Sequence, residues 1–129
     1  MSFKAAAIQM RSGVDPVRNA ADMERLVRAA VAEGAVYVQT PEMTGAIQKD
    51  RQALRAQLRD DDGDIIVATA ARLARELGIH VHVGSTAIAR PDGREPHARP
   101  TAQVTGASAV APARLPCSSS TPRTVTARC

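Results

Sequence analysis

The chain of 129 residues is long enough for one small domain and too short for two. Its formal charge of +4 arises after residue 93, because residues 1–93 hold 12 basic and 12 acidic side chains, whereas residues 94–129 hold five Arg and one Glu. No apolar run approaches the roughly 20 residues of a membrane span. With no secretory signal after Met1, we expect a cytoplasmic protein with no membrane partner.

The first third of the chain predicts a strand followed by a helix. Residues 3–10 contain the apolar run AAAI, which is typical of a parallel strand covered on both faces. Asp15 and Pro16 form a strong helix start, a capping carboxylate before a proline at the first helical position. The helix should continue to about Glu33 and end at Gly34. Its predicted buried stripe consists of Met23, Leu26, Val27, Ala30 and Val31.

A second strand is predicted directly after this helix. Val36, Tyr37 and Val38 favour a pleated, half-buried surface, and Pro41 cannot donate to a sheet ladder. A strand, a helix and a strand make a crossover unit with a parallel sheet. Glu42 then stands where the strand ends, the edge at which ligands bind in open α/β sheets. Glu42 is therefore a candidate general base, although a Glu at such a position is more often a solvated loop residue.

The next segment predicts two more helices and a third strand. Residues 49–58 favour a short charged helix, and residues 64–77 favour an amphipathic helix that ends at Gly78. Between them, residues 60–64 hold four Asp around one Gly, which resembles a calcium loop but lacks its closing Glu. We interpret this run as a turn that caps the following helix. Residues 79–83 predict the third strand, and residues 91–93 a turn.

His80 and His82 are two residues apart on the third predicted strand and therefore share one face. Such a pair can bind a metal, but no third ligand is evident nearby. We expect both histidines to be hydrogen-bonded within the fold, and we expect no metal and no cofactor. The glycines at 78 and 84 flank a strand rather than open a helix, which argues against a phosphate loop.

Three motifs together resemble the nitrilase, or carbon–nitrogen hydrolase, superfamily. They are FKAAAIQM, GAVYVQTPEMTG and GIHVHVGSTAI, and the resemblance covers residues 3–93, with PEMTG closest to the omega-amidase and deaminated-glutathione-amidase branch. The resemblance implies the N-terminal part of an α-β-β-α sandwich. It also implies that Glu42 is the general base of a Glu-Lys-Cys triad acting on a small amide. Members of this family often form homodimers.

The pattern changes at residue 94, so we divide the chain into a family-like part, 1–93, and a tail, 94–129. The tail is rich in Pro, Ser, Thr, Ala and Arg, and we predict that it is disordered. It could be an interaction arm, a linker, or the out-of-frame translation of a GC-rich coding region, and we favour the last. Its lack of aromatic residues and of a dense basic cluster argues against nucleic-acid binding.

The Lys and the Cys of the family triad have no counterpart in this sequence. Cys117 lies among Pro and Ser with no strand before it, an environment that does not stabilise a thiolate, and no Lys follows Lys49. We therefore expect an amidase by descent that is inactive in this form. The alternative is a non-catalytic α/β interaction module with a basic flexible tail. In either case we expect an exposed apolar face on the sheet or on the helices.

Overall fold

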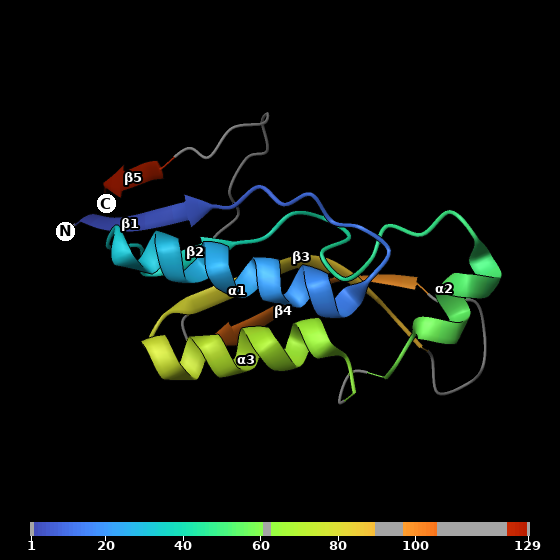
Figure 1. Ribbon diagram of the computed structural model, residues 1–129. Coiled ribbons are helices and arrows are strands. Elements are labelled where there is room, and N and C mark those ends of the chain that lie inside the picture. Colours follow the sequence, from blue (N-terminus) through green and yellow to red (C-terminus); the bar gives the residue numbers. More distant parts are fainter. Residues whose placement is uncertain (1, 61–62, 90–96, 106–123, 129) are drawn as a thin grey trace.

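The computed structural model describes residues 2–60, 63–89, 97–105 and 124–128. These residues form five strands and three helices (Figure 1). In chain order they are β1 (Ser2–Ala7), α1 (Pro16–Ala32), β2 (Tyr37–Gln39), α2 (Arg51–Gln57), α3 (Ile65–Leu77), β3 (His80–Ile88), β4 (His97–Thr105) and β5 (Thr124–Arg128). None of the helices within these ranges is long and apolar enough to cross a membrane.

One sheet joins all five described strands in the order β4-β3-β2-β1-β5. Its centre is parallel, with Ala6 opposite Val38 and Val38 opposite Val81. The parallel sheet predicted from the strand–helix–strand pattern is thus confirmed. The outer strands β4 and β5 run antiparallel to β3 and β1. Both antiparallel strands come from the segment that follows residue 93.

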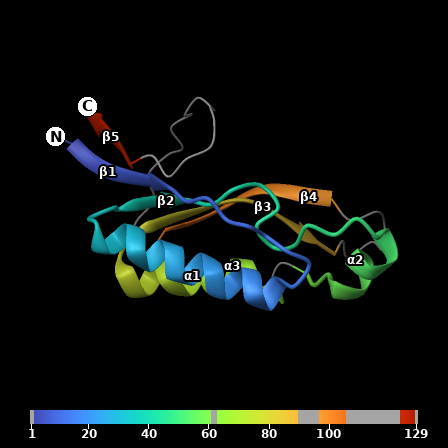
Figure 2. The same cartoon turned by 45° about the horizontal axis from the view of Figure 1, so that its top comes forward.

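Helices α1 and α3 lie side by side on one face of the sheet (Figures 1 and 2). The core lies between these helices and the three parallel strands. Its fully buried side chains include Met23 and Val27 of α1, Leu73 of α3 and Val81 of β3. Alanine fills much of the remaining space, as the shortage of aromatic residues requires.

Each described helix begins at an aspartate whose carboxylate accepts two backbone N–H groups. Oδ1 of Asp15 accepts from Val17 at 2.9 Å and from Arg18 at 3.4 Å. Asp50 and Asp64 cap α2 and α3 in the same way. The helix starts predicted at residues 15–16 and 64 are confirmed, because a capping carboxylate satisfies N–H groups that the helix itself leaves free.

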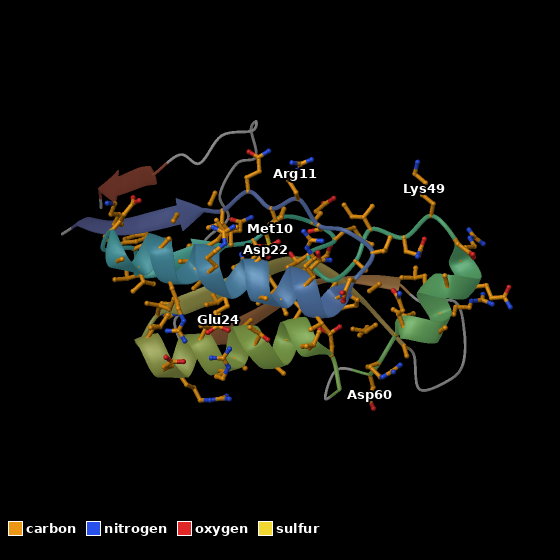
Figure 3. All side chains as sticks on the ribbon, viewed as in Figure 1. Met10, Arg11, Asp22, Glu24, Lys49 and Asp60 are labelled. Atoms are coloured by element: carbon orange, nitrogen blue, oxygen red, sulfur yellow. The ribbon has the colours of Figure 1, made fainter. Side chains whose placement is uncertain are left out.

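A ring of four charged side chains joins the exposed sides of α1 and α3. Arg28 and Arg72 each form ion pairs with both Glu24 and Glu76, at distances of 2.5 to 3.2 Å. Figure 3 shows Glu24 between the two helices. Hydrogen bonds from Arg72 and then Arg28 hold the pKa of the Glu24 carboxyl below its ordinary value. Because the ring is solvent-exposed, it links the two helices but contributes little to the free energy of unfolding.

The strand boundaries differ from the predicted ones at two places. The first strand ends at Ala7 instead of residue 10, although Ile8 still donates to the carbonyl oxygen of Gln39 at 2.9 Å. Beyond Ile8 the described part of the chain offers the first strand no neighbouring strand on this side, since β2 ends before Pro41. The third strand continues through Gly84 to Ile88, because β4 supplies partners for its residues on both sides of Gly84.

Two segments of the tail are described as strands of the sheet. Residues 97–105 pair with β3 and residues 124–128 pair with β1. Sheet pairing uses backbone groups, which every residue except Pro can offer in full, so an unpaired edge can bind a strand of weak side-chain propensity. Pro100 is compatible with β4 because that strand is at the edge of the described sheet. Residues 94–96, 106–123 and 129, including Cys117, lie outside the described part of the chain.

The sheet face opposite the helices is more polar than we predicted. Phe3 is 43% exposed, but Tyr37 and Gln39 of β2 and His80 and His82 of β3 are partly buried polar neighbours at its centre. Exposed apolar side chains are otherwise scattered over the helical side and the loops, at Val14, Val17, Val36 and Ile47. The described residues therefore form a helix layer on a sheet layer, with polar side chains of β2 and β3 on the outer face of the sheet.

We expect Leu73→Ala to lower the free energy of unfolding by about 2–5 kcal/mol, because it leaves a cavity at a fully buried position. Chemical denaturation followed by circular dichroism measures this loss. Leu77→Ala, at a partly buried position on the same helix, is the matched control and should cost clearly less. Equal losses for the two variants would contradict the described core.

Candidate active site

Glu42 lies in a turn just beyond the C-terminal end of β2 and is exposed to solvent. The N-terminal ends of α1 and α3 lie at the same edge of the sheet (Figure 1). Among the described residues, no side chain forms a hydrogen bond or an ion pair with the Glu42 carboxylate. The structure therefore places a free carboxylate at the edge where the sequence predicted a site.

Two threonines hold the turn from within. The hydroxyl of Thr44 donates to the carbonyl oxygen of Pro41 at 2.7 Å, and the Thr40 and Thr44 hydroxyls are 2.7 Å apart. The backbone N–H of Gly84 donates to the Thr40 hydroxyl at 3.2 Å. Both threonines are buried, so these hydrogen bonds are shielded from competition by water.

Strand β3 holds the turn from one side. The backbone N–H of Met43 donates to the hydroxyl of Ser85 at 2.8 Å, and that of Thr44 donates to the carbonyl oxygen of Ser85 at 2.9 Å. Met43 has a φ of 52°, in the left-handed region that is uncommon for a residue with a side chain. The two hydrogen bonds from β3 offset the energetic cost of this conformation. The conformation makes the chain turn sharply after Glu42.

Two glycines permit the close contact between the turn and β3. A Cβ on Gly84 would lie 2.5 Å from the carbonyl oxygen of Pro41, and a Cβ on Gly45 would overlap the hydroxyl of Thr86. The first neighbour is backbone and cannot move aside cheaply. Gly84 is therefore required by the close approach of two backbones rather than by its own torsion angles.

Helix α1 holds the turn from the other side through Asn19, which is 2% exposed. Its amide nitrogen donates to the carbonyl oxygens of Gly45 at 2.8 Å and Gly13 at 3.0 Å, and its Oδ1 accepts from the N–H of Gly13 at 2.9 Å. The turn is thus fixed to α1 and β3, and Glu42 is the exposed residue that it presents. A rigid support of this kind is what a general base needs.

Tyr37 and His82 form a second polar group, on the sheet face opposite the helices. The Tyr37 hydroxyl and Nδ1 of His82 are hydrogen-bonded at 2.6 Å, with the rings edge to face at a centroid distance of 6.2 Å. Burial raises the pKa of Tyr37 and lowers the pKa of His82. The hydrogen bond agrees with the expected structural role of His82. No group of three potential metal-ligand side chains occurs within the described ranges.

Sequence reasoning identified Glu42 but missed the residues that hold its turn. Thr40 and Thr44 flank the Pro-Glu pair, and Gly84-Ser85 follow the third predicted strand, so both segments can be recognised in the sequence. The contact between these two segments cannot be predicted in this way, because it depends on which strands are neighbours in the sheet. Asn19 gave no signal, since a polar residue on an amphipathic helix normally faces solvent. Lys49, the last Lys in the sequence, lies in a loop and is exposed to solvent.

Ser85→Ala removes the acceptor of the Met43 N–H, and we expect it to lower the free energy of unfolding by about 1–3 kcal/mol. Amide hydrogen exchange at Met43 should become faster. The matched control is Ser12→Ala, because the Ser12 hydroxyl is buried without a hydrogen-bond partner among the described residues and its removal should be nearly neutral. Unchanged exchange at Met43 would show that Ser85 does not hold the turn.

The lowered pKa of His82 makes stability depend on pH. The unfolded state binds a proton near the ordinary pKa of 6.5 and the folded state only at lower pH, so the contribution of His82 is complete above 6.5 and is lost as pH falls. Chemical denaturation at several pH values between about 8 and 5 should show that the free energy of unfolding decreases as pH falls, and His82→Gln should make this decrease smaller. Tyr37→Phe should keep the decrease, because burial of His82 is what lowers its pKa. An unchanged loss in His82→Gln would contradict this assignment.

No protein-family model matches the sequence, and the comparison with curated proteins finds no similar one. Solved structures do match. XC1258 from Xanthomonas campestris, described as a CN-hydrolase superfamily protein, is 19% identical with a TM-score of 0.65, and the match covers 82% of this chain and 37% of that one. Saccharomyces cerevisiae Nit3, a member of branch 10 of the nitrilase superfamily, is 15% identical with a TM-score of 0.69, over 81% of this chain and 40% of that one.

The Caenorhabditis elegans NitFhit protein is 20% identical with a TM-score of 0.59, over 70% of this chain and 22% of that one. The chain thus spans well under half the length of each of these three structures. Since 82% of 129 residues is more than the first 93, the match to XC1258 includes residues of the tail. The chain thus has a fold similar to part of these nitrilase-superfamily, or carbon–nitrogen hydrolase, structures.

Proposed function

We propose that this chain is a carbon–nitrogen hydrolase by descent, in which Glu42 is the general base for a small amide substrate. The observation that carries the proposal is the rigid turn that presents a free carboxylate at the C-terminal end of β2. The fold supports it, and so do the names of structural neighbours such as an amidase from Nesterenkonia sp. and an N-terminal amidase with a Gln-Gly peptide.

In the mechanism implied by the resemblance, a Cys attacks the amide carbon, and the Glu takes the thiol proton. A thioester then forms and is hydrolysed, while a Lys stabilises the oxyanion of the tetrahedral intermediate. In this chain Glu42 can supply only the base. Residues that act as one catalytic unit are strongly non-additive, so a base without its nucleophile leaves little activity. We infer that the chain in this form does not turn over amides.

The origin of the tail bears on whether the chain can hydrolyse amides. We propose that residues 94–129 derive from a shift of reading frame near the codon for Gly93, because the composition changes abruptly there. Strand β4 lies where the resemblance expects a return strand, but backbone pairing tolerates many sequences and does not distinguish a shifted frame from a native one. Reading the nucleotide sequence in all three frames beyond that codon tests the proposal directly.

We expect another frame to encode a return strand, then a Lys within a Tyr-Asp-Lys stretch and a Cys within a Cys-Tyr-Asp stretch. A chain with that frame restored should hydrolyse small omega-amides. Glu42→Gln in it should lower kcat by about 10²–10⁴-fold, the usual contribution of a general base. Glu33→Gln is the matched control, since Glu33 is an exposed residue at the end of α1, and it should leave kcat unchanged.

If no frame continues the pattern, and if amide turnover is absent, the interaction module becomes the better proposal. One observation favours it as the second candidate. Tyr37, His80 and His82 are partly exposed on the sheet face that the described helices leave uncovered. A stable stoichiometric complex that is lost when this face is altered would support a binding function. Turnover by the chain as it stands that survives Glu42→Gln would contradict the first proposal.

A further inference from the structure

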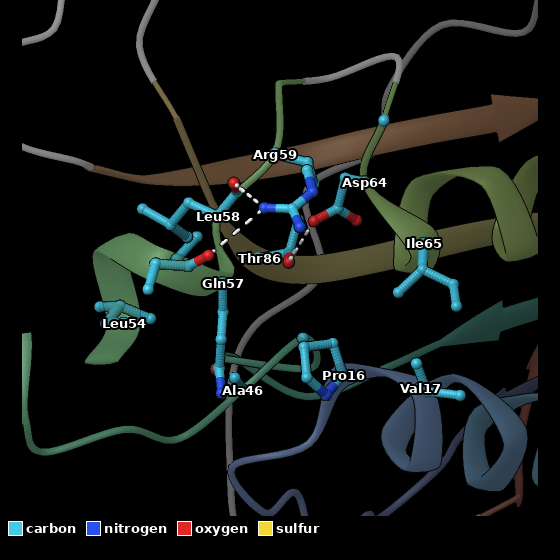
Figure 4. Close-up of a pocket in the computed structure, with 14 residues that line it drawn as sticks. Pro16, Val17, Ala46, Leu54, Gln57, Leu58, Arg59, Asp64, Ile65 and Thr86 are labelled. Atoms are coloured by element: carbon cyan, nitrogen blue, oxygen red, sulfur yellow. Dashed lines mark hydrogen bonds between the residues drawn. The ribbon is translucent and has the colours of Figure 1, made fainter. Parts of the chain in front are cut away.

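A cavity of about 350 Å³ lies on the helical side of the sheet, separate from the Tyr37–His82 face. It is open to solvent on one side and is lined by the first turn of α1, by α2, by the start of α3 and by the end of β3 (Figure 4). Its volume is within the range of small-molecule sites, which is roughly 300–1,000 Å³. The lining thus joins three separate parts of the sequence, the start of α1, the α2–α3 segment and the end of β3.

Most of the cavity wall is apolar. Val17 of α1, Leu54 of α2 and Ile65 of α3 line it, together with Pro16, Ala46 and Ala87. The two buried polar side chains in the wall are already satisfied. Oδ1 of Asp64 accepts from Ile66 and Val67, and its Oδ2 accepts from the Thr86 hydroxyl at 3.3 Å. The apolar wall therefore fits a hydrocarbon group rather than a sugar or a nucleotide.

Arg59 is the cationic residue of this wall, and its guanidinium is held in place. Nη1 donates to the carbonyl oxygen of Leu58 at 2.9 Å and to that of Ala56 at 3.4 Å, at the C-terminal end of α2. The backbone of Arg59 is also fixed, because its carbonyl oxygen accepts from the N–H of Ala89 at 2.8 Å. Figure 4 shows the hydrogen bond between the guanidinium and the carbonyl oxygen of Leu58.

The other two guanidinium nitrogens of Arg59 form no hydrogen bond within the described part of the chain, and Arg59 forms no ion pair with Asp64 there. Nε and Nη2 make up the fork that binds a carboxylate through two parallel hydrogen bonds. The negative charge of Asp64 is offset by the N-terminal end of α3, which it caps. A pre-oriented fork therefore adjoins an apolar cavity.

We propose that this cavity binds a short aliphatic carboxylate, with the carboxylate on Arg59 and the hydrocarbon chain between Val17, Leu54 and Ile65. A single guanidinium matches the single charge of a carboxylate better than the double charge of a phosphate monoester. The helix starts beside the cavity do not provide an anion site of their own, because Asp15 and Asp64 already occupy them. The site does not involve Glu42 and is independent of the amidase proposal.

The test is calorimetric titration of the whole chain with hexanoate, hexanamide and acetate. Hexanoate should bind saturably, with a Kd on the order of 1 mM. Hexanamide, which keeps the chain and lacks the charge, and acetate, which keeps the charge and lacks the chain, should each bind at least tenfold more weakly. Because these three titrations use the unmodified protein, their result does not depend on how a variant folds.

Variants then locate the site. Arg59→Gln should weaken hexanoate binding at least tenfold. Arg75→Gln, which removes the same charge from an exposed position near the end of α3, should leave it unchanged. Glu42→Gln should also leave it unchanged, which separates this site from the proposed catalytic one. Equal affinities for hexanoate and hexanamide, no saturation by hexanoate, or full binding by folded Arg59→Gln would each overturn the proposal.

Discussion

The backbone of β3 passes so close to Thr40 and Pro41 that residue 84 has no room for a side chain. This approach lets Ser85 and the Gly84 N–H reach the turn that carries Glu42. The turn can adopt its left-handed residue only because β3 and α1 supply hydrogen bonds on both sides. The position of the carboxylate is therefore a property of the packed α/β layer and not of the loop alone, which is how a folded scaffold positions a reactive group.

The helices could be predicted from the sequence because their signals are local. A capping aspartate, an apolar stripe and a terminal glycine lie within one short segment, so α1 and α3 were located to within one or two residues. The parallel centre of the sheet was also predictable, since the strands at residues 37 and 80 each follow a helix. The position of Glu42 followed from the same local pattern, because Pro41 ends the strand before it.

The rest of the site and of the sheet depends on contacts between distant residues. Asn19 stands on a helix, where its sequence neighbours indicate nothing about the loop that it binds. Strands β4 and β5 join the sheet through backbone groups, which composition does not reveal. The Arg59 cavity is formed by four separate elements, none of which has the sequence of a binding motif.

The two outer strands determine which edges of the sheet remain unpaired. Both β4 and β5 come from the segment that follows residue 93, and they cover the edges of β3 and β1. A fragment that ended after β3 would expose two rows of unpaired backbone groups, and such edges recruit other chains into aggregates. Strands β4 and β5 pair with these two edges and become the outer strands of the described sheet, where Pro100 has no backbone N–H group to donate from β4. The chain thus pairs the edges of β3 and β1 with its own later segments and not with another molecule.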